Sequence, residues 1–102
     1  MANRRLELHG LLCGLLGSRH VYFQPPESVK MRYPAIVYNL DYIENKHADD
    51  GVYLSNRRYQ VIAIDANPDS ELIEKIASLP TCQFNRHYEQ DNLNHDVFTL
   101  YY

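Results

Sequence analysis

The strongest constraint on the fold is an alternation of apolar and other residues along 33–44. Large apolar or aromatic side chains occupy every second position of this segment: Ile36, Tyr38, Leu40 and Tyr42. Successive side chains of a strand point to opposite faces of a sheet, so the alternation predicts a strand with one buried face. The segment 57–65 repeats the pattern, with Tyr59, Val61 and Ala63 expected on the buried face.

Residues 45–56 connect these two predicted strands and are mostly polar. They contain Asp50-Gly51, which is a turn signal. The strands and their connection therefore predict a long β-hairpin with a charged tip. A connection of about a dozen residues exceeds the two to five that are usual for hairpins, and long loops often carry function.

A second hairpin is predicted at the end of the sequence. Residues 81–89 and 95–102 both alternate, and the polar residues 90–94 between them are expected to form the turn. Apolar residues continue to the last position. Flexible tails seldom have this composition, so we expect the end of the chain to lie inside the sheet or in an interface.

Two segments have helical spacing instead. Residues 3–16 carry a leucine stripe that Gly17 ends, and residues 67–79 carry a second stripe that Pro80 ends. Asn67 is the expected cap of the second helix, with Pro68 at its first position. The stripe residues are Leu8, Leu11, Leu12 and Leu15 in the first helix, and Leu72, Ile73, Ile76 and Leu79 in the second.

Together these segments predict a single α+β domain over residues 1–102. A short strand at 21–24, closed by Pro25-Pro26, precedes the first hairpin. The expected order is α-β-ββ-α-ββ. It corresponds to an antiparallel sheet of two hairpins plus a short strand, with two helices packed on one face.

The charge balance argues against tight binding to nucleic acid. Ten basic and thirteen acidic residues give a formal net charge of −3, and neither half of the chain is basic. No apolar run approaches the roughly 20 residues of a membrane span, so we expect no membrane partner. The first residues lack the apolar core of a secretory signal. Cys13 and Cys82 are therefore expected to be free, buried thiols, although the sequence leaves a disulfide open.

A cluster of potential metal ligands lies in the last hairpin: His87, Glu89, Asp91, His95 and Asp96. Zinc needs three or four converging ligands, and this spacing matches no familiar site. The chain has no glycine-flanked serine elbow and no glycine-rich phosphate loop. We therefore expect no catalytic residue, no metal and no cofactor.

A nuclease or another small nucleic-acid-acting domain is an alternative. It would need a group such as Arg86, His87 and Glu89. The predicted alternation places His87 on the face opposite Arg86, which separates the group. A plain interaction domain in another complex is a further alternative that the residues leave open.

The first hairpin offers a candidate subunit interface. Its charged arm can dock on a neighbouring copy and give register and orientation more than affinity. Nine tyrosines also suit half-buried faces and interfaces. The expected interface residues are Lys46, Asp49, Asp50, Tyr53, Arg57 and Arg58.

Nearly the whole chain resembles the small tail-completion proteins of long-tailed bacteriophages, which include tail terminators and tail-to-head joining proteins. The stretches that carry the resemblance are 33–38 (YPAIVY), 59–65 (YQVIAID), 67–70 (NPDS) and 97–102 (VFTLYY). The resemblance implies a structural protein with no enzymatic residues.

Such a protein would form a hexameric ring on the last ring of the tail tube, stop tube growth and present a surface to the head connector. Its partners would be itself, the tail tube protein and the connector, and DNA would pass through the lumen without specific binding. It would occupy the tail–head junction of the virion, and the host cytoplasm during assembly. A stopper or adaptor role in the head–neck connector is the alternative within this resemblance.

Overall fold

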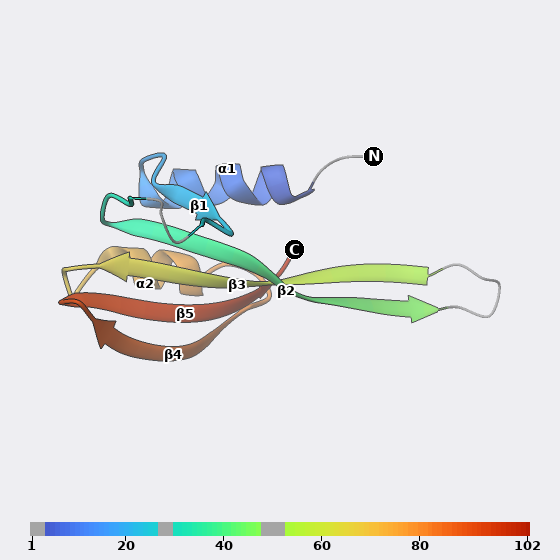
Figure 1. The fold of residues 1–102 in the computed structure, drawn as a ribbon. Coiled ribbons are helices and arrows are strands. Elements are labelled where there is room, and N and C mark those ends of the chain that lie inside the picture. Colours follow the sequence, from blue (N-terminus) through green and yellow to red (C-terminus); the bar gives the residue numbers. More distant parts are fainter. Residues whose placement is uncertain (1–3, 27–29, 48–52) are drawn as a thin grey trace.

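The computed structural model describes residues 4–26, 30–47 and 53–102. The elements in chain order are α1 (Arg4–Leu16), β1 (Val21–Phe23), β2 (Ala35–His47), β3 (Tyr53–Asp65), α2 (Glu71–Ala77), β4 (Cys82–Gln90) and β5 (Leu93–Tyr101). The α+β fold and the order α-β-ββ-α-ββ are confirmed (Figure 1). None of the described helices is both long and apolar enough to cross a bilayer.

The five strands form one sheet in the order β1-β2-β3-β5-β4. The expectation of an antiparallel sheet is wrong at one edge, because β1 runs parallel to β2 and the sheet is mixed. The segment 24–34 connects these two parallel strands in the sequence. Backbone hydrogen bonds of 3.0 Å fix this edge, from Gln24 N to Tyr38 O and from Ile36 N to His20 O.

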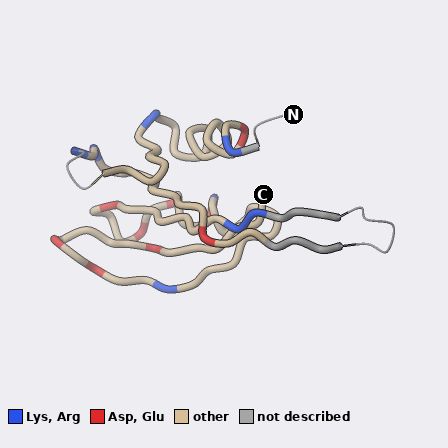
Figure 2. The backbone as a smooth tube through the Cα atoms, turned by 45° about the vertical axis from the view of Figure 1, so that its right-hand side comes forward, with Lys and Arg blue, Asp and Glu red and all other residues tan. Residues whose placement is uncertain are grey.

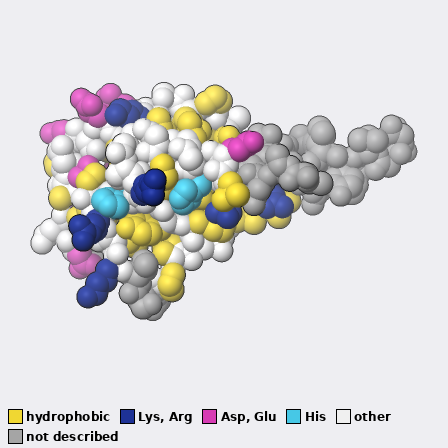
Figure 3. Space-filling model, turned by 90° about the horizontal axis from the view of Figure 1, so that it is seen from above, with side chains coloured by type: hydrophobic (Ala, Val, Ile, Leu, Met, Phe, Trp, Pro, Cys, Tyr) yellow, Lys and Arg dark blue, Asp and Glu magenta, His cyan; other side chains and the backbone are white. Residues whose placement is uncertain are grey.

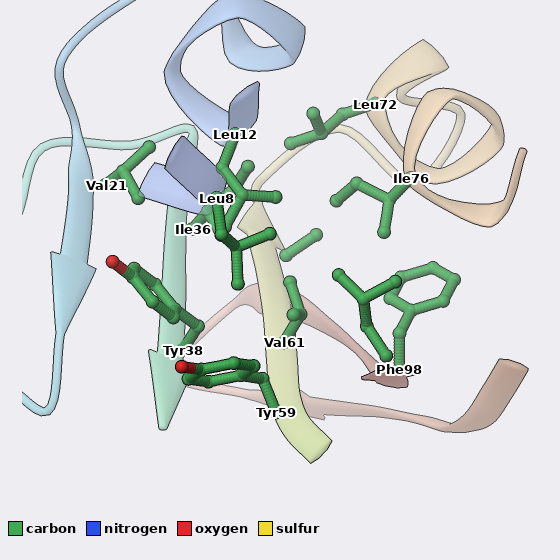
Figure 4. Close-up of a cluster of buried hydrophobic side chains, with 12 residues drawn as sticks. Leu8, Leu12, Val21, Ile36, Tyr38, Tyr59, Val61, Leu72, Ile76 and Phe98 are labelled. Atoms are coloured by element: carbon green, nitrogen blue, oxygen red, sulfur yellow. The ribbon is translucent and has the colours of Figure 1, made fainter. Parts of the chain in front are cut away.

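Both helices cover the same face of the sheet, as expected (Figure 4). The core residues come from α1, from α2, from the edge strand β1 and from the three central strands. They include Leu8, Leu12, Ile36, Tyr38, Tyr59, Val61, Leu72, Ile76, Phe98 and Leu100. We call the opposite side of the sheet the far face. We call the part of the sheet that the two helices cover, together with those helices, the body. The predicted burial of the alternating residues is confirmed within the body, because the helices form a second layer there.

A β-bulge ends this alternation in β2. The register shifts between Leu40, which faces Tyr59, and Tyr42, which faces Arg58. Tyr42 is therefore turned to the far face and is 51% exposed, so its predicted burial is wrong. A bulge adds one unpaired residue and reverses the facing of those that follow.

The first hairpin is longer than the sequence pattern predicts. The two strands continue through most of the expected connection, to the pair His47–Tyr53. We call residues 42–47 and 53–58 the arm, and the end at Arg58 its root. The arm extends past the body and gives the molecule extents of 52 × 24 × 23 Å (Figure 1).

The second helix and the second hairpin differ from their predictions in detail. Ser70, not Asn67, caps α2, and its Oγ accepts a hydrogen bond from Leu72 N at 3.3 Å. Asn67 instead accepts one from Asp69 N and closes a turn before the helix. The turn between β4 and β5 is shortened to Asp91-Asn92, whose positive φ angles suit a tight hairpin.

One leucine and both cysteines are less buried than the sequence predicts. Leu11 belongs to the predicted apolar stripe of α1 but is 38% exposed, because the helix contacts the sheet mainly through Leu8 and Leu12. Cys13 and Cys82 are free, as expected, but only partly buried. Both pack against the edge of the core cluster.

Candidate interface at the arm root

The predicted interface residues fall on and beyond the arm. Lys46 pairs with Leu54, and Tyr53 pairs with His47, near the outer end of the described ladder. Asp49 and Asp50 lie outside the described residues. Arg57 and Arg58 lie at the root, where their surroundings are defined.

Arg58 is held on two sides. Its Nε donates to Asp41 Oδ2 at 2.8 Å, and its guanidinium lies 5.1 Å from the ring centre of Tyr42. The Asp41–Arg58 pair is about one-third exposed. Figure 2 shows acidic and basic positions side by side where the arm leaves the body. The three side chains form one ordered group on the far face.

The pKa of Arg58 is raised. Partial desolvation lowers it, but the hydrogen bond to Tyr101 and the attraction of the Asp41 carboxylate outweigh that effect. Arg58 therefore keeps its charge at any physiological pH. Neither Asp41 nor Tyr101 is among the residues predicted for this site, since only the strand register brings them beside Arg58.

Arg57 does not join this group. It pairs with Ile43 in the ladder, one position further out than Arg58, and so points to the opposite side of the ribbon. Its carbonyl accepts a hydrogen bond from Tyr102 N at 3.0 Å, which ties the last residue to the arm root. The two adjacent arginines therefore lie on opposite faces of the arm and do not form a single basic patch.

Apolar side chains are exposed beside these charges. Tyr42 and Ile43 are 51% and 40% exposed, and they lie on opposite faces of the arm. Figure 3 shows hydrophobic side chains next to basic ones where the body meets the arm. Exposed apolar groups with charged neighbours are typical of interaction surfaces.

A hollow of about 250 Å³ lies near the end of β5, at the same end of the body as the arm root. Its lining is mostly apolar. The lining residues are Leu11, Leu79, Pro80, Thr81, Leu100, Tyr101 and Tyr102. The expectation that the end of the chain lies in the sheet or an interface is met here, because these last residues are half-buried and wall the hollow.

The alternative nuclease group is divided between two faces. Arg86 faces Val97, and its guanidinium lies 5.3 Å from the ring centre of Tyr88 on the far face. His87 points to the helix-bearing face, where its Nδ1 lies 2.7 Å from Asp96 Oδ1. The separation expected from the alternation is therefore present.

The potential metal ligands of the last hairpin are also divided. His95 stacks on Tyr88, with ring centres 4.7 Å apart, on the face away from His87 and Asp96. Within the described ranges, no three His, Cys, Asp or Glu residues come together as metal ligands would. Burial raises the pKa of the Cys82 thiol, which disfavours the thiolate that nucleophilic chemistry needs.

The chain has no match among protein-family models, and none among the curated proteins.

Proposed function

We propose that this chain is a structural subunit of a bacteriophage tail, which ends the tail tube by self-associating into a ring and joins the tube to the head connector. The resemblance of stretches such as 33–38 and 97–102 to tail-completion proteins supports this role. The ring is hexameric in this proposal, acts without catalysis, and belongs to the tail–head junction of the virion.

One observation carries the proposal: the arm has a charged and aromatic root, and within the described part of the chain its outer strands pair only with each other. Beyond Arg57, β3 pairs only with β2 among the described residues, and Tyr42 and Ile43 are exposed beside Arg58. A two-stranded ribbon has little independent stability in water. Docking on a neighbouring copy would give it a packed surface.

The charge distribution fits a ring that surrounds DNA without gripping it. The formal net charge is −3, and at the arm root Asp41 neutralises Arg58. A surface that binds phosphates tightly would expose clustered, unneutralised arginines and lysines. Surface complementarity between subunits, rather than nucleic-acid affinity, is the mode of action we propose.

The test is tail completion with a charge-reversed arm root. Arg57→Glu combined with Arg58→Glu should abolish ring assembly on tail tubes and completion of tails, while circular dichroism and the unfolding midpoint stay near wild type. The matched control is Lys30→Glu with Arg32→Glu, two exposed basic residues outside the arm. Negative-stain images would score rings and completed tails.

The outcomes separate the parts of the proposal. Normal completion by the arm-root variant would show that Arg57 and Arg58 are not subunit contacts. A wild-type chain that neither caps tail tubes nor completes tails would refute the tail role. Binding to filled heads instead of tail tubes would assign the chain to the head–neck connector.

A further inference from the structure

The hollow beside the end of β5 is shaped to take an aromatic side chain. Its volume is about 250 Å³, and its walls include Leu11, Leu79, Pro80 and Tyr102. An apolar cavity of about 150 Å³ already accepts benzene, so this hollow has room for a tyrosine ring. Leu11 is 38% exposed there, whereas Leu8 and Leu12 of the same helix are fully buried.

One wall of the hollow is held in a strained conformation. Thr81 has a φ of 63°, which is unusual for a β-branched residue. Its hydroxyl donates a hydrogen bond to Tyr101 O at 2.6 Å and so fixes this wall to the end of β5. Strain of this kind persists only where the surroundings hold it, and a preformed site lowers the cost of binding.

A matching side chain is exposed at the arm root. Tyr42 is 51% exposed, and the Arg58 guanidinium lies over its ring while Asp41 holds Arg58 at 2.8 Å. Tyrosine and arginine are enriched among the residues that dominate binding energy. Tyr42 is therefore an exposed aromatic side chain that Arg58 holds in position for binding, and we call it the anchor.

The two surfaces are also complementary in charge. Glu7 is exposed and lies one helical turn before Leu11, which lines the hollow, so the two residues share one side of α1. Arg58 accompanies Tyr42, and its guanidinium has donors beyond the one that Asp41 accepts. Seating Tyr42 in such a hollow would bring Arg58 toward Glu7.

The chain's own Tyr42 is badly placed to fill the hollow. The bulge turns Tyr42 to the far face, whereas Leu11 and Leu79 wall the hollow from the helix-bearing side. The arm also runs away from the body (Figure 1). We propose that the hollow receives Tyr42 from a second copy of this chain, with Arg58 of that copy beside Glu7.

In this proposal the anchor of one copy enters the hollow of the next, which makes the contact head-to-tail. Contacts of this type build a ring where the rotation closes and a filament where it does not. This inference rests on the proposed ring and names the contact between its neighbouring subunits.

Sedimentation of the purified full chain from micromolar to millimolar concentration tests the contact. The wild type should associate reversibly. Tyr42→Ser and Leu11→Glu should each weaken association by about 10- to 30-fold, as loss of a central anchor does. Tyr33→Ser and Leu6→Glu are the matched controls, because Tyr33 and Leu6 are 45% and 58% exposed but line no part of the hollow. Thermal unfolding would confirm that all four variants are folded.

An equimolar mixture of Tyr42→Ser and Leu11→Glu gives a sharper result. The Leu11→Glu chain keeps its anchor and the Tyr42→Ser chain keeps its hollow, so the mixture should form dimers and nothing larger. Glu7→Lys should weaken wild-type association, and Glu74→Lys, on the exposed side of α2, should not.

The outcomes distinguish this contact from the proposed function. Three results would each overturn the contact. The first is equal association of wild type, Tyr42→Ser and Leu11→Glu. The others are a mixture of these two variants that stays monomeric, and a wild type that is monomeric at millimolar concentration. Wild-type association that the variants abolish, in a chain that never caps tail tubes, would support the contact and refute the tail role.

Discussion

His87 on the edge strand and Asp96 on its neighbour face each other across the last ladder, with Nδ1 and Oδ1 2.7 Å apart. The Asp96 side chain is only 7% exposed, whereas that of His87 is 42% exposed. A carboxylate this deeply buried needs a partner, because leaving it unsatisfied costs more than the bond itself contributes. His87 therefore joins β4 to the rest of the sheet through a charged or strongly polar contact.

Replacing His87 should destabilise the fold. In His87→Ala, Asp96 loses its partner, and the free energy of unfolding should fall by about 1–3 kcal/mol at neutral pH. Glu89→Ala, an exposed change on the same strand, should stay within about 0.5 kcal/mol of wild type. Urea unfolding measures both. Equal stability of the His87 variant and wild type would mean that water replaces the histidine at no cost.

Two adjacent leucines of α1 should respond very differently to truncation. Leu12 is fully buried and Leu11 is 38% exposed, although the sequence pattern treats them alike. Leu12→Ala should cost about 2–5 kcal/mol, and Leu11→Ala about 1 kcal/mol or less. Comparable losses measured by chemical denaturation would contradict the placement of α1 on the sheet.

The body of the fold follows from the sequence because local pattern and tertiary packing agree there. The alternation at Ile36, Tyr38, Tyr59 and Val61 marks the buried face, and the helices have the apolar stripes needed to cover it. β1 is harder to place, since three residues carry no signal that separates a parallel from an antiparallel edge.

The arm root is where the sequence pattern fails. A single extra residue between Leu40 and Tyr42 reverses the facing of the strand, and the alternation itself continues without a break. Asp41 lies 17 positions from Arg58, so only the register reveals that they pair. Arg57 and Arg58 were predictable as arm residues, but not as residues of opposite faces.

Removing the Asp41–Arg58 pair should affect self-association more than the stability of the fold. Both side chains of the pair are about one-third exposed to solvent, and exposed ion pairs contribute about 0.2–1 kcal/mol. Asp41→Ala should therefore change the free energy of unfolding by less than about 1 kcal/mol, yet weaken self-association because Arg58 no longer holds the Tyr42 ring. Unfolding and sedimentation on the same sample check this. A large loss of stability with unchanged association would reverse the interpretation.

Tyr38 should make the fold sensitive to alkaline pH. Burial raises the pKa of Tyr38 above its usual value of 10.0, although the nearby Arg5 partly opposes the shift. The folded chain therefore keeps the phenol proton at pH values where the unfolded chain releases it. This contribution to stability is complete below pH 10 and is lost as the pH rises through the folded-state pKa.

Tyr38→Phe removes both the titration and a hydrogen bond. The Tyr38 hydroxyl lies 2.8 Å from His9 Nδ1, so the variant should be about 0.5–1.5 kcal/mol less stable at neutral pH. Above pH 10 its stability should fall less steeply than that of wild type. Tyr22→Phe is the control, because Tyr22 is a half-buried tyrosine of the neighbouring edge strand. Urea unfolding at neutral pH and at several alkaline values would measure the slopes. Equal slopes for wild type and Tyr38→Phe would show that Tyr38 ionises in the folded chain as readily as in the unfolded one.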